Sequence, residues 1–252
     1  MDQIRRSLCG VVAAVKLSIW IGFDSRDALS YVVARHSALR LLTQPVPVRG
    51  LVLSELQTSG VYRRPTRKDE RGQLWDDLSA APMSTEFSLS RFIVPHLAGE
   101  GLALFVDSDV LFRVNPLEIF ALHCNGKAVS IVKHDHRPIS GTKMSGALQT
   151  SYSRKNWSSL MLFDCDHPSV RSLTPDVVNT ASGLHLHQFR WLRDDEIGEL
   201  PARCNYLVGS TELPVGEEPA VVHWTEGSPY LPGYANVEYA SEFWQEVRRW
   251  AR

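Results

Sequence analysis

Residues 102 to 112 read Leu-Ala-Leu-Phe-Val-Asp-Ser-Asp-Val-Leu-Phe, and this stretch decides the expected fold. Five apolar residues in a row (102–106) are typical of a short strand buried on both faces of a sheet. Ligands of open α/β sheets bind just beyond the carboxyl ends of such strands. Side chains two positions apart on extended backbone face the same side, so Asp107 and Asp109 are expected to share one ligand.

Two convergent carboxylates are the ligands that Mg²⁺ or Mn²⁺ prefers, especially when phosphate oxygens complete the coordination shell. The Asp107-Ser108-Asp109 motif alone fits two solvated acids in a turn equally well. The rest of the sequence favours the metal site, because the motifs around it fit the same chemistry.

Length and composition indicate one large soluble domain. The chain has 252 residues, of which 44% are apolar, enough for a substantial core. Its formal net charge of −1 gives no basic field that would attract nucleic acid. Its four cysteines form no C-x-x-C pair, which favours a reducing compartment, and the cytoplasm is the expected location. No apolar run reaches the ~18 residues of a transmembrane segment.

The sequence predicts an α/β fold whose mostly parallel mixed sheet is flanked by helices. It opens with a β-α-β unit of strand 17–23, helix 28–42 and strand 48–53. Further helices are expected at 84–97, 115–120 and from 174 onward, and further strands at 128–132, 160–163, 201–208 and 220–222. One domain is expected over 17–236, followed by an amphipathic helix over 237–252.

Three segments allow two interpretations each. Residues 62–73 hold five basic side chains and are either a solvated surface loop or a mobile lid that meets phosphate or acceptor. The helix at 237–252 either packs on its own protein or makes peripheral membrane contact. His134 and His136 are expected to form hydrogen bonds rather than a second metal site.

Together these motifs resemble the GT-A fold glycosyltransferases of family 8, the type of glycogenin and the bacterial galactosyltransferases. The resemblance covers residues 17 to 230. It is carried by the first strand (19–24), by Ser84-x6-Arg91-x3-Pro95, by the D-x-D motif (105–109), and by Val222-His223-x3-Gly227-x-Pro229-Tyr230.

The resemblance implies that Asp107, Asp109 and His223 hold a divalent ion, Mn²⁺ or Mg²⁺. It implies a hexose donor of the UDP-sugar type, a glycan, lipid-linked or other acceptor, and retention of configuration. The residues expected to bind the nucleotide sugar are Asp24, Arg26, Arg91, Ser108, Lys143, Lys155 and Gly227. The residues expected to act in catalysis or contact the sugar are Asn156, Gln188 and Asp195.

The chain departs from the family pattern at two places. The closing motif lacks the family's lysine and has one extra residue before Gly227, so Lys143, Arg154 or Lys155 would have to meet the leaving phosphate. The family's Asp-Gln pair has no clear counterpart. His187-Gln188 and Asp194-Asp195 are the alternatives.

Three other functions were weighed. A HAD-type phosphatase needs its D-x-D near the chain start, whereas here more than a hundred residues precede it. A nucleotide-sugar pyrophosphorylase needs a glycine-rich basic loop after the first strand, and residues 21–26 do not supply one. A sugar-nucleotide-binding protein without catalytic activity fits the missing lysine.

Overall fold

A six-stranded sheet forms the centre of the molecule. The computed structural model describes residues 15–134, 154 and 156–252. In the sheet the strands follow the order β10-β8-β9-β6-β1-β2, and every strand is parallel to the others except β9. The strands are β1 (Leu17–Gly22), β2 (Val48–Leu51), β6 (Leu102–Val106), β8 (Val129–Ile131), β9 (Leu160–Asp164) and β10 (Ile197–Glu199).

The predicted β-α-β opening is confirmed. A short 3₁₀ turn, η1 (Ser25–Asp27), follows β1 because the Asp24 side chain caps it by accepting a hydrogen bond from the Arg26 amide. Helix α2 (Ala28–Leu41) then returns the chain to β2, which pairs in parallel with β1. This crossover places the end of β1 beside the end of β6.

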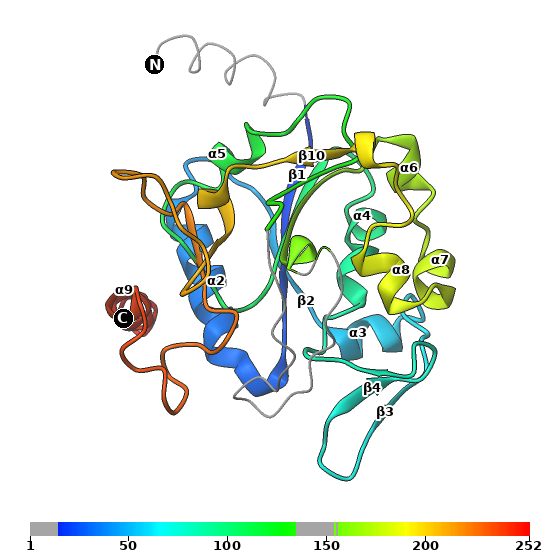
Figure 1. The fold of residues 1–252 in the computed structure, drawn as a ribbon, viewed down its shortest axis with the longest axis horizontal. Helices are drawn as coiled ribbons and strands as arrows, with labels where there is room; N and C mark the ends of the chain where they lie inside the picture. The colour runs from blue at the N-terminus through cyan, green and yellow to red at the C-terminus, as the bar shows by residue number, and fades with distance from the viewer. Residues whose placement is uncertain (1–14, 135–153, 155) are drawn as a thin grey trace.

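Helices cover both faces of the sheet (Figure 1). Alternate strand residues divide between the faces, as the two-residue period of a strand requires. Trp20, Phe105 and Phe163 pack against the layer that contains α3 (Leu53–Thr58), α4 (Val94–Ala98), α6 (Pro168–Arg171), α7 (Pro175–Thr180) and α8 (Gly183–His187). Ile19, Leu104 and Leu162 pack against α2 and α5 (Leu117–Phe120).

A small second sheet brings a late part of the chain back to the end of β6. It contains β7 (Val110–Phe112), β12 (Val221–His223) and β11 (Tyr206–Leu207). Strand β12 runs antiparallel to β7 with His223 opposite Val110, and the Trp224 amide donates to the Asp109 carbonyl at 3.0 Å. The pairing therefore sets His223 next to the turn that carries the two aspartates.

The C-terminal helix α9 (Ala240–Trp250) lies beside α2 (Figure 1). Phe243 of this helix is fully buried, and the buried Glu246 carboxylate of the same helix binds Arg40 of α2 at 2.9 Å and His36 at 2.7 Å. Its buried face thus packs on the protein itself. Among the helices of the described residues, none is both long and apolar enough to cross a membrane.

Part of residues 62–73 forms a strand, which neither the surface-loop nor the lid interpretation predicted. Strand β3 (Thr66–Lys68) pairs antiparallel with β4 (Leu74–Asp76), and β5 (Ala81–Pro82) completes a third sheet. The turn between β3 and β4 forms because the Asp69 carboxylate accepts from the amides of Arg71 and Gln73, with Gly72 at a positive φ of 77°. This sheet projects from the body of the protein (Figure 1).

Two predicted elements are shorter than expected. The helix expected at 84–97 begins only at Ser90, as a 3₁₀ turn η2 (Ser90–Ile93) that leads into α4, because Thr85 and Ser88 form a local side-chain turn before it. The strand expected at 201–208 is a 3₁₀ turn, η5 (Ala202–Asn205), followed by the two residues of β11. The helix expected from 174 onward is α7, and the Thr174 side chain caps it by accepting from the Val177 amide.

We expect the third sheet to depend on the buried Arg64–Asp76 ion pair, whose side chains are 0% and 2% exposed. Arg64 also donates to the carbonyls of Val178 and Ala181, which join this sheet to α7. Arg64→Met leaves a buried carboxylate without its partner, and should lower the free energy of unfolding by about 3–5 kcal/mol in urea titrations. The exposed pair of Arg171 and Asp166 supplies the control: Arg171→Met should cost less than about 1 kcal/mol. Equal losses would contradict this role.

Candidate active site

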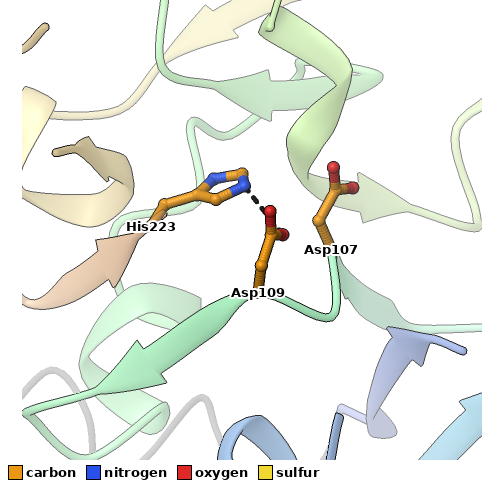
Figure 2. A group of neighbouring side chains, drawn as sticks. All are labelled: Asp107, Asp109 and His223. Carbon is orange, nitrogen blue, oxygen red and sulfur yellow. Dashed lines mark ion pairs between the residues drawn. The ribbon is translucent and has the colours of Figure 1, made fainter. Parts of the chain in front are cut away.

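Asp107, Asp109 and His223 converge at the carboxyl edge of the central sheet (Figure 2). Their possible ligand atoms all lie within 4.8 Å of one another, and His223 Nε2 is 3.1 Å from Asp109 Oδ1. Both aspartates are partly exposed, whereas Ser108 between them is 2% exposed. The two aspartates therefore face one side as expected, and the Ser108 side chain is buried instead of facing the cluster's opening.

This donor set fits a divalent cation. Two carboxylates are hard oxygen ligands, and one imidazole adds a nitrogen that suits Mn²⁺ better than Ca²⁺ or Mg²⁺. Three protein ligands leave coordination positions open for a substrate. The surrounding charge also favours a cation, because burial and the charge of Asp109 raise the pKa of the nearby Asp27 to about 6.

Arg91 holds Asp107 in place from the buried side. Its guanidinium lies 2.8 Å from Asp107 Oδ1 and donates to the Ser158 carbonyl at 2.8 Å. The same group sits 5.2 Å and 5.0 Å from the ring centres of Phe87 and Phe105, and Arg91 is only 5% exposed. Arg91 therefore orients the metal-site carboxylate, and it also lines the adjoining cavity.

A cavity of about 490 Å³ adjoins Asp107. The third sheet forms one wall and α8 another. Its lining includes the hydroxyls of Ser79, Ser84, Ser88, Ser158, Ser159 and Ser182, together with Trp75, Met83, Leu89, Asn156 and Leu184. The position of the cavity beside the aspartates makes it the natural place for a ligand group next to a bound cation.

The described lining of this cavity carries little net charge. Asp76 pairs with Arg64, and Arg91 pairs with Asp107. Burial, with help from the charges of Arg91 and Arg64, lowers the pKa of His187 to about 3, so its imidazole is neutral at neutral pH. His187 Nδ1 lies 2.8 Å from Ser158 Oγ, which fixes the ring against the cavity wall.

Asp24 does not offer a free carboxylate oxygen to a ligand, contrary to the contact expected from the resemblance. It is 2% exposed, and its oxygens accept hydrogen bonds from the Arg26 amide and guanidinium and from the Glu86 amide. Burial alone would raise the pKa of Asp24, but the hydrogen bonds from Arg26 hold it below its ordinary value. Asp24 thus positions Arg26, whose side chain remains 47% exposed.

The three predicted catalytic residues fall in different places. Asn156 lines the cavity with a left-handed backbone (φ 64°). Gln188 follows His187 at the end of α8, and its carbonyl accepts from Arg154 at 3.0 Å. The structure does not bring Asp195 to the cluster: this residue precedes β10 at the amino edge of the sheet, and its exposed carboxylate pairs with Arg193. Of the two alternatives, His187-Gln188 is the pair beside the cavity.

The other residues that were expected to contact the nucleotide sugar are Gly227, Lys143, Lys155 and Arg154. A Cβ on Gly227 would lie 2.6 Å from the Tyr234 ring, so close packing accounts for this glycine. Lys143 and Lys155 lie outside the described residues, as does His136. Arg154 pairs with Asp194 at 2.6 Å.

Sequence reasoning missed Asn205. Its side chain is 1% exposed and binds His223, Ser159 and His134 at once. The available signal was its position inside the late strand expected at 201–208, which by itself does not reveal its partners.

No protein-family model matches the chain. Protein CDI of Arabidopsis thaliana is 39% identical over 236 residues, which cover 92% of this chain and 86% of that protein. The chain belongs to the Protein CDI family. The membership leaves the reaction open, since the family name says nothing about chemistry.

Solved structures similar to this CDI-family member are glycosyltransferases. They include WbbM, a bifunctional glycosyltransferase (TM-score 0.56, 14% identity), GlyE of Streptococcus pneumoniae TIGR4 (0.59, 11%) and the galactosyltransferase LgtC with donor and acceptor sugar analogues (0.56, 11%). The matches cover 92%, 94% and 92% of this chain. The chain spans 52% of the WbbM chain and 61% of the GlyE chain, but 95% of LgtC. The predicted GT-A fold is confirmed.

We expect Asp109→Asn to weaken Mn²⁺ binding at least tenfold while leaving the fold intact, since it removes one charged ligand at a partly exposed turn. Direct titration with Mn²⁺, followed by electron paramagnetic resonance of the free ion, measures the dissociation constant. Asp164→Asn is the matched control, because Asp164 also carries a carboxylate at a strand end, as the last residue of β9, and its side chain is 24% exposed, against 19% for Asp109. Unchanged Mn²⁺ affinity in Asp109→Asn would remove this residue from the metal site.

We expect His187 to make stability depend on pH. Its pKa is lower in the folded protein than in the unfolded chain, so unfolding takes up a proton between about pH 3 and pH 6.5. Stability therefore falls as the pH drops through this window, by up to about 1.4 kcal/mol per pH unit from this group. His187→Gln should flatten the fall between pH 7 and pH 5 in urea unfolding. Parallel curves for the two proteins would rule out a neutral buried His187.

Proposed function

We propose that this protein is a metal-dependent glycosyltransferase that moves a hexose from a UDP-sugar to a glycan, lipid-linked or other acceptor. One observation carries the proposal: the Asp107–Asp109–His223 cluster lies at the carboxyl edge of a GT-A sheet, beside a cavity of about 490 Å³. A nucleotide sugar needs both features, a cation for its diphosphate and a hollow for its sugar.

In this proposal the protein residues hold and orient the reactants. Asp107, Asp109 and His223 hold Mn²⁺ or Mg²⁺, which when bound acts as a Lewis acid on the diphosphate leaving group. Arg91 keeps the Asp107 carboxylate pointing at the cluster through its 2.8 Å contact. Arg26, anchored by Asp24 and half-exposed at the end of β1, is the described cation best placed to meet the nucleotide.

The cavity supports a neutral sugar as the transferred group. Its serine hydroxyls and Asn156 can exchange hydrogen bonds with sugar hydroxyls, while Trp75 and Leu89 provide apolar surface. Its charged lining residues are paired within the protein, so a carboxylate on a uronic acid would find no described counter-charge there. Asn156 and Gln188 are the proposed contacts near the reacting carbon, and retention of configuration rests on the resemblance.

We propose a cytoplasmic location for the protein and a lipid-linked acceptor as one candidate substrate. The described cysteines are free thiols, which supports a reducing, cytoplasmic environment. The outer face of α9 exposes Trp250 (53%) and Trp244 (37%) near Arg248 and Arg252, which would suit peripheral contact with a membrane that carries a lipid-linked acceptor. A sugar-nucleotide-binding protein without turnover is the alternative.

Calorimetric titration of UDP tests the donor site. With Mn²⁺ present we expect binding in the micromolar range, and with EDTA a loss of at least tenfold, because a cation held by the aspartates and His223 would offset the charge of the diphosphate. GDP titrated under the same conditions is the control for base selection. The rates of slow donor hydrolysis are then compared between UDP-hexoses and a UDP-uronic acid. This comparison tests whether the cavity prefers an uncharged sugar.

The outcomes separate the alternatives. Metal-dependent UDP binding with hydrolysis of a neutral UDP-sugar supports the transferase. If UDP binds but no sugar is transferred or hydrolysed across a panel of donors and acceptors, the result would favour a sugar-nucleotide-binding protein without catalytic activity. No UDP binding with or without metal would overturn the UDP-sugar assignment.

A further inference from the structure

Asn205 lies directly behind His223, on the side away from the two aspartates. Its Oδ1 is 2.8 Å from His223 Nδ1. Its Nδ2 is 2.9 Å from Ser159 Oγ and 3.0 Å from His134 Nε2. The residue is 1% exposed, so these contacts are made without competition from bulk water.

The network determines which way the Asn205 amide faces. Ser159 Oγ uses its proton to donate to the Asn156 carbonyl at 2.7 Å, so toward Asn205 it can only accept. The Asn205 NH₂ group must therefore face Ser159, and its oxygen must face His223. This orientation follows from the donors and acceptors around the amide.

An amide oxygen accepts hydrogen bonds and cannot donate them. His223 Nδ1 must then carry the proton in this contact. In the neutral imidazole, Nε2 is left with its lone pair, and it is Nε2 that lies 3.1 Å from Asp109 Oδ1 in the cluster. The tautomer required of a metal ligand is thus selected by a residue outside the metal site.

The fold fixes Asn205 through the same small sheet that delivers His223. Strand β11 begins one residue after Asn205 and pairs in parallel with β12, with Leu207 opposite His223. On the other side, the Ser159 carbonyl accepts from the Asp107 amide at 3.0 Å. The network therefore joins the backbone of one metal-site residue to the side chain of another.

We propose that Asn205 is a positioning residue of the metal site: it holds His223 in the Nδ1–H tautomer and aims Nε2 at the cation. The inference rests on the proposed metal site and extends it by a residue that does not touch the metal. If it holds, Mn²⁺ affinity depends on the acceptor oxygen at position 205, and not only on the three ligands.

The test measures the Mn²⁺ dissociation constant of the full chain by electron paramagnetic resonance, with Mn²⁺ alone as the probe. Asn205→Ala should weaken Mn²⁺ binding 10- to 100-fold, the range typical for loss of such an outer partner. Asn205→Asp keeps the acceptor for His223 and loses the donors to Ser159 and His134, so it should retain Mn²⁺ affinity within about threefold. If Asn205 had only a structural role, Asn205→Asp would weaken Mn²⁺ binding as much as Asn205→Ala does.

Asn179→Ala is the matched control. Asn179, in α7, is also buried, accepts from the Arg63 amide at 2.7 Å and donates to the Val61 carbonyl at 2.9 Å, and neither partner belongs to the proposed metal site. Its loss should reduce thermal stability as Asn205→Ala does, with Mn²⁺ affinity unchanged.

A double-mutant cycle with His223→Ala tests the route of the effect. In that background Asn205→Ala should change Mn²⁺ affinity less than twofold, because the ligand it positions is already gone. If the wild-type protein and Asn205→Ala bind Mn²⁺ equally well, the inference is overturned and the proposed function stands. Wild-type protein that binds no Mn²⁺ would overturn the proposed metal site itself, and the inference with it.

Discussion

The antiparallel pairing of β12 with β7 is the interaction on which the candidate site depends. The D-x-D motif lies between the end of β6 and the start of β7. Strand β7 has an edge to which another strand can pair. Because β12 takes that edge with His223 opposite Val110, an imidazole from late in the chain reaches two carboxylates from its middle. The backbone bond from Trp224 to Asp109 fixes the register, and a slip by one residue would turn His223 away from them.

Charge is distributed unevenly around this junction. On the cavity side, each charged lining residue has an opposite charge within the protein, as in Arg64–Asp76 and Arg91–Asp107. On the β1 side, burial and the nearby charge of Asp109 raise the pKa of Asp27 to about 6, and Tyr230 donates to Asp27 at 2.7 Å. A cation at the cluster would offset this repulsion, whereas a neutral ligand group suits the cavity.

The sequence was sufficient for features encoded locally and insufficient for those set by distant pairing. The strands at 17–22 and 102–106 and helix α2 were predictable from apolar runs and caps, and the metal-site trio from the motifs of the resemblance. Strands β3 to β5 were not predicted, because this segment is rich in charged residues and lacks the apolar pattern of a strand. The signal for the β3–β4 pairing is the turn formed by Asp69 and Gly72. The position of Asp195 at the amino edge of the sheet could not be predicted, because chain order does not say which edge of the sheet a loop occupies. Asn205 needed three partners 18 to 71 positions away, which no local pattern reveals.

The place of β12 in chain order has a consequence for biosynthesis. The last strand of the central sheet, β10, ends at Glu199, whereas β12 begins only at Val221. As the ribosome releases the chain from its amino end, the six-stranded sheet can be complete while the Asp107–Asp109–His223 cluster still lacks its imidazole. The sheet and the proposed cation site are therefore completed at different stages of synthesis, and a nascent chain with a finished sheet does not yet present all three side chains to a cation.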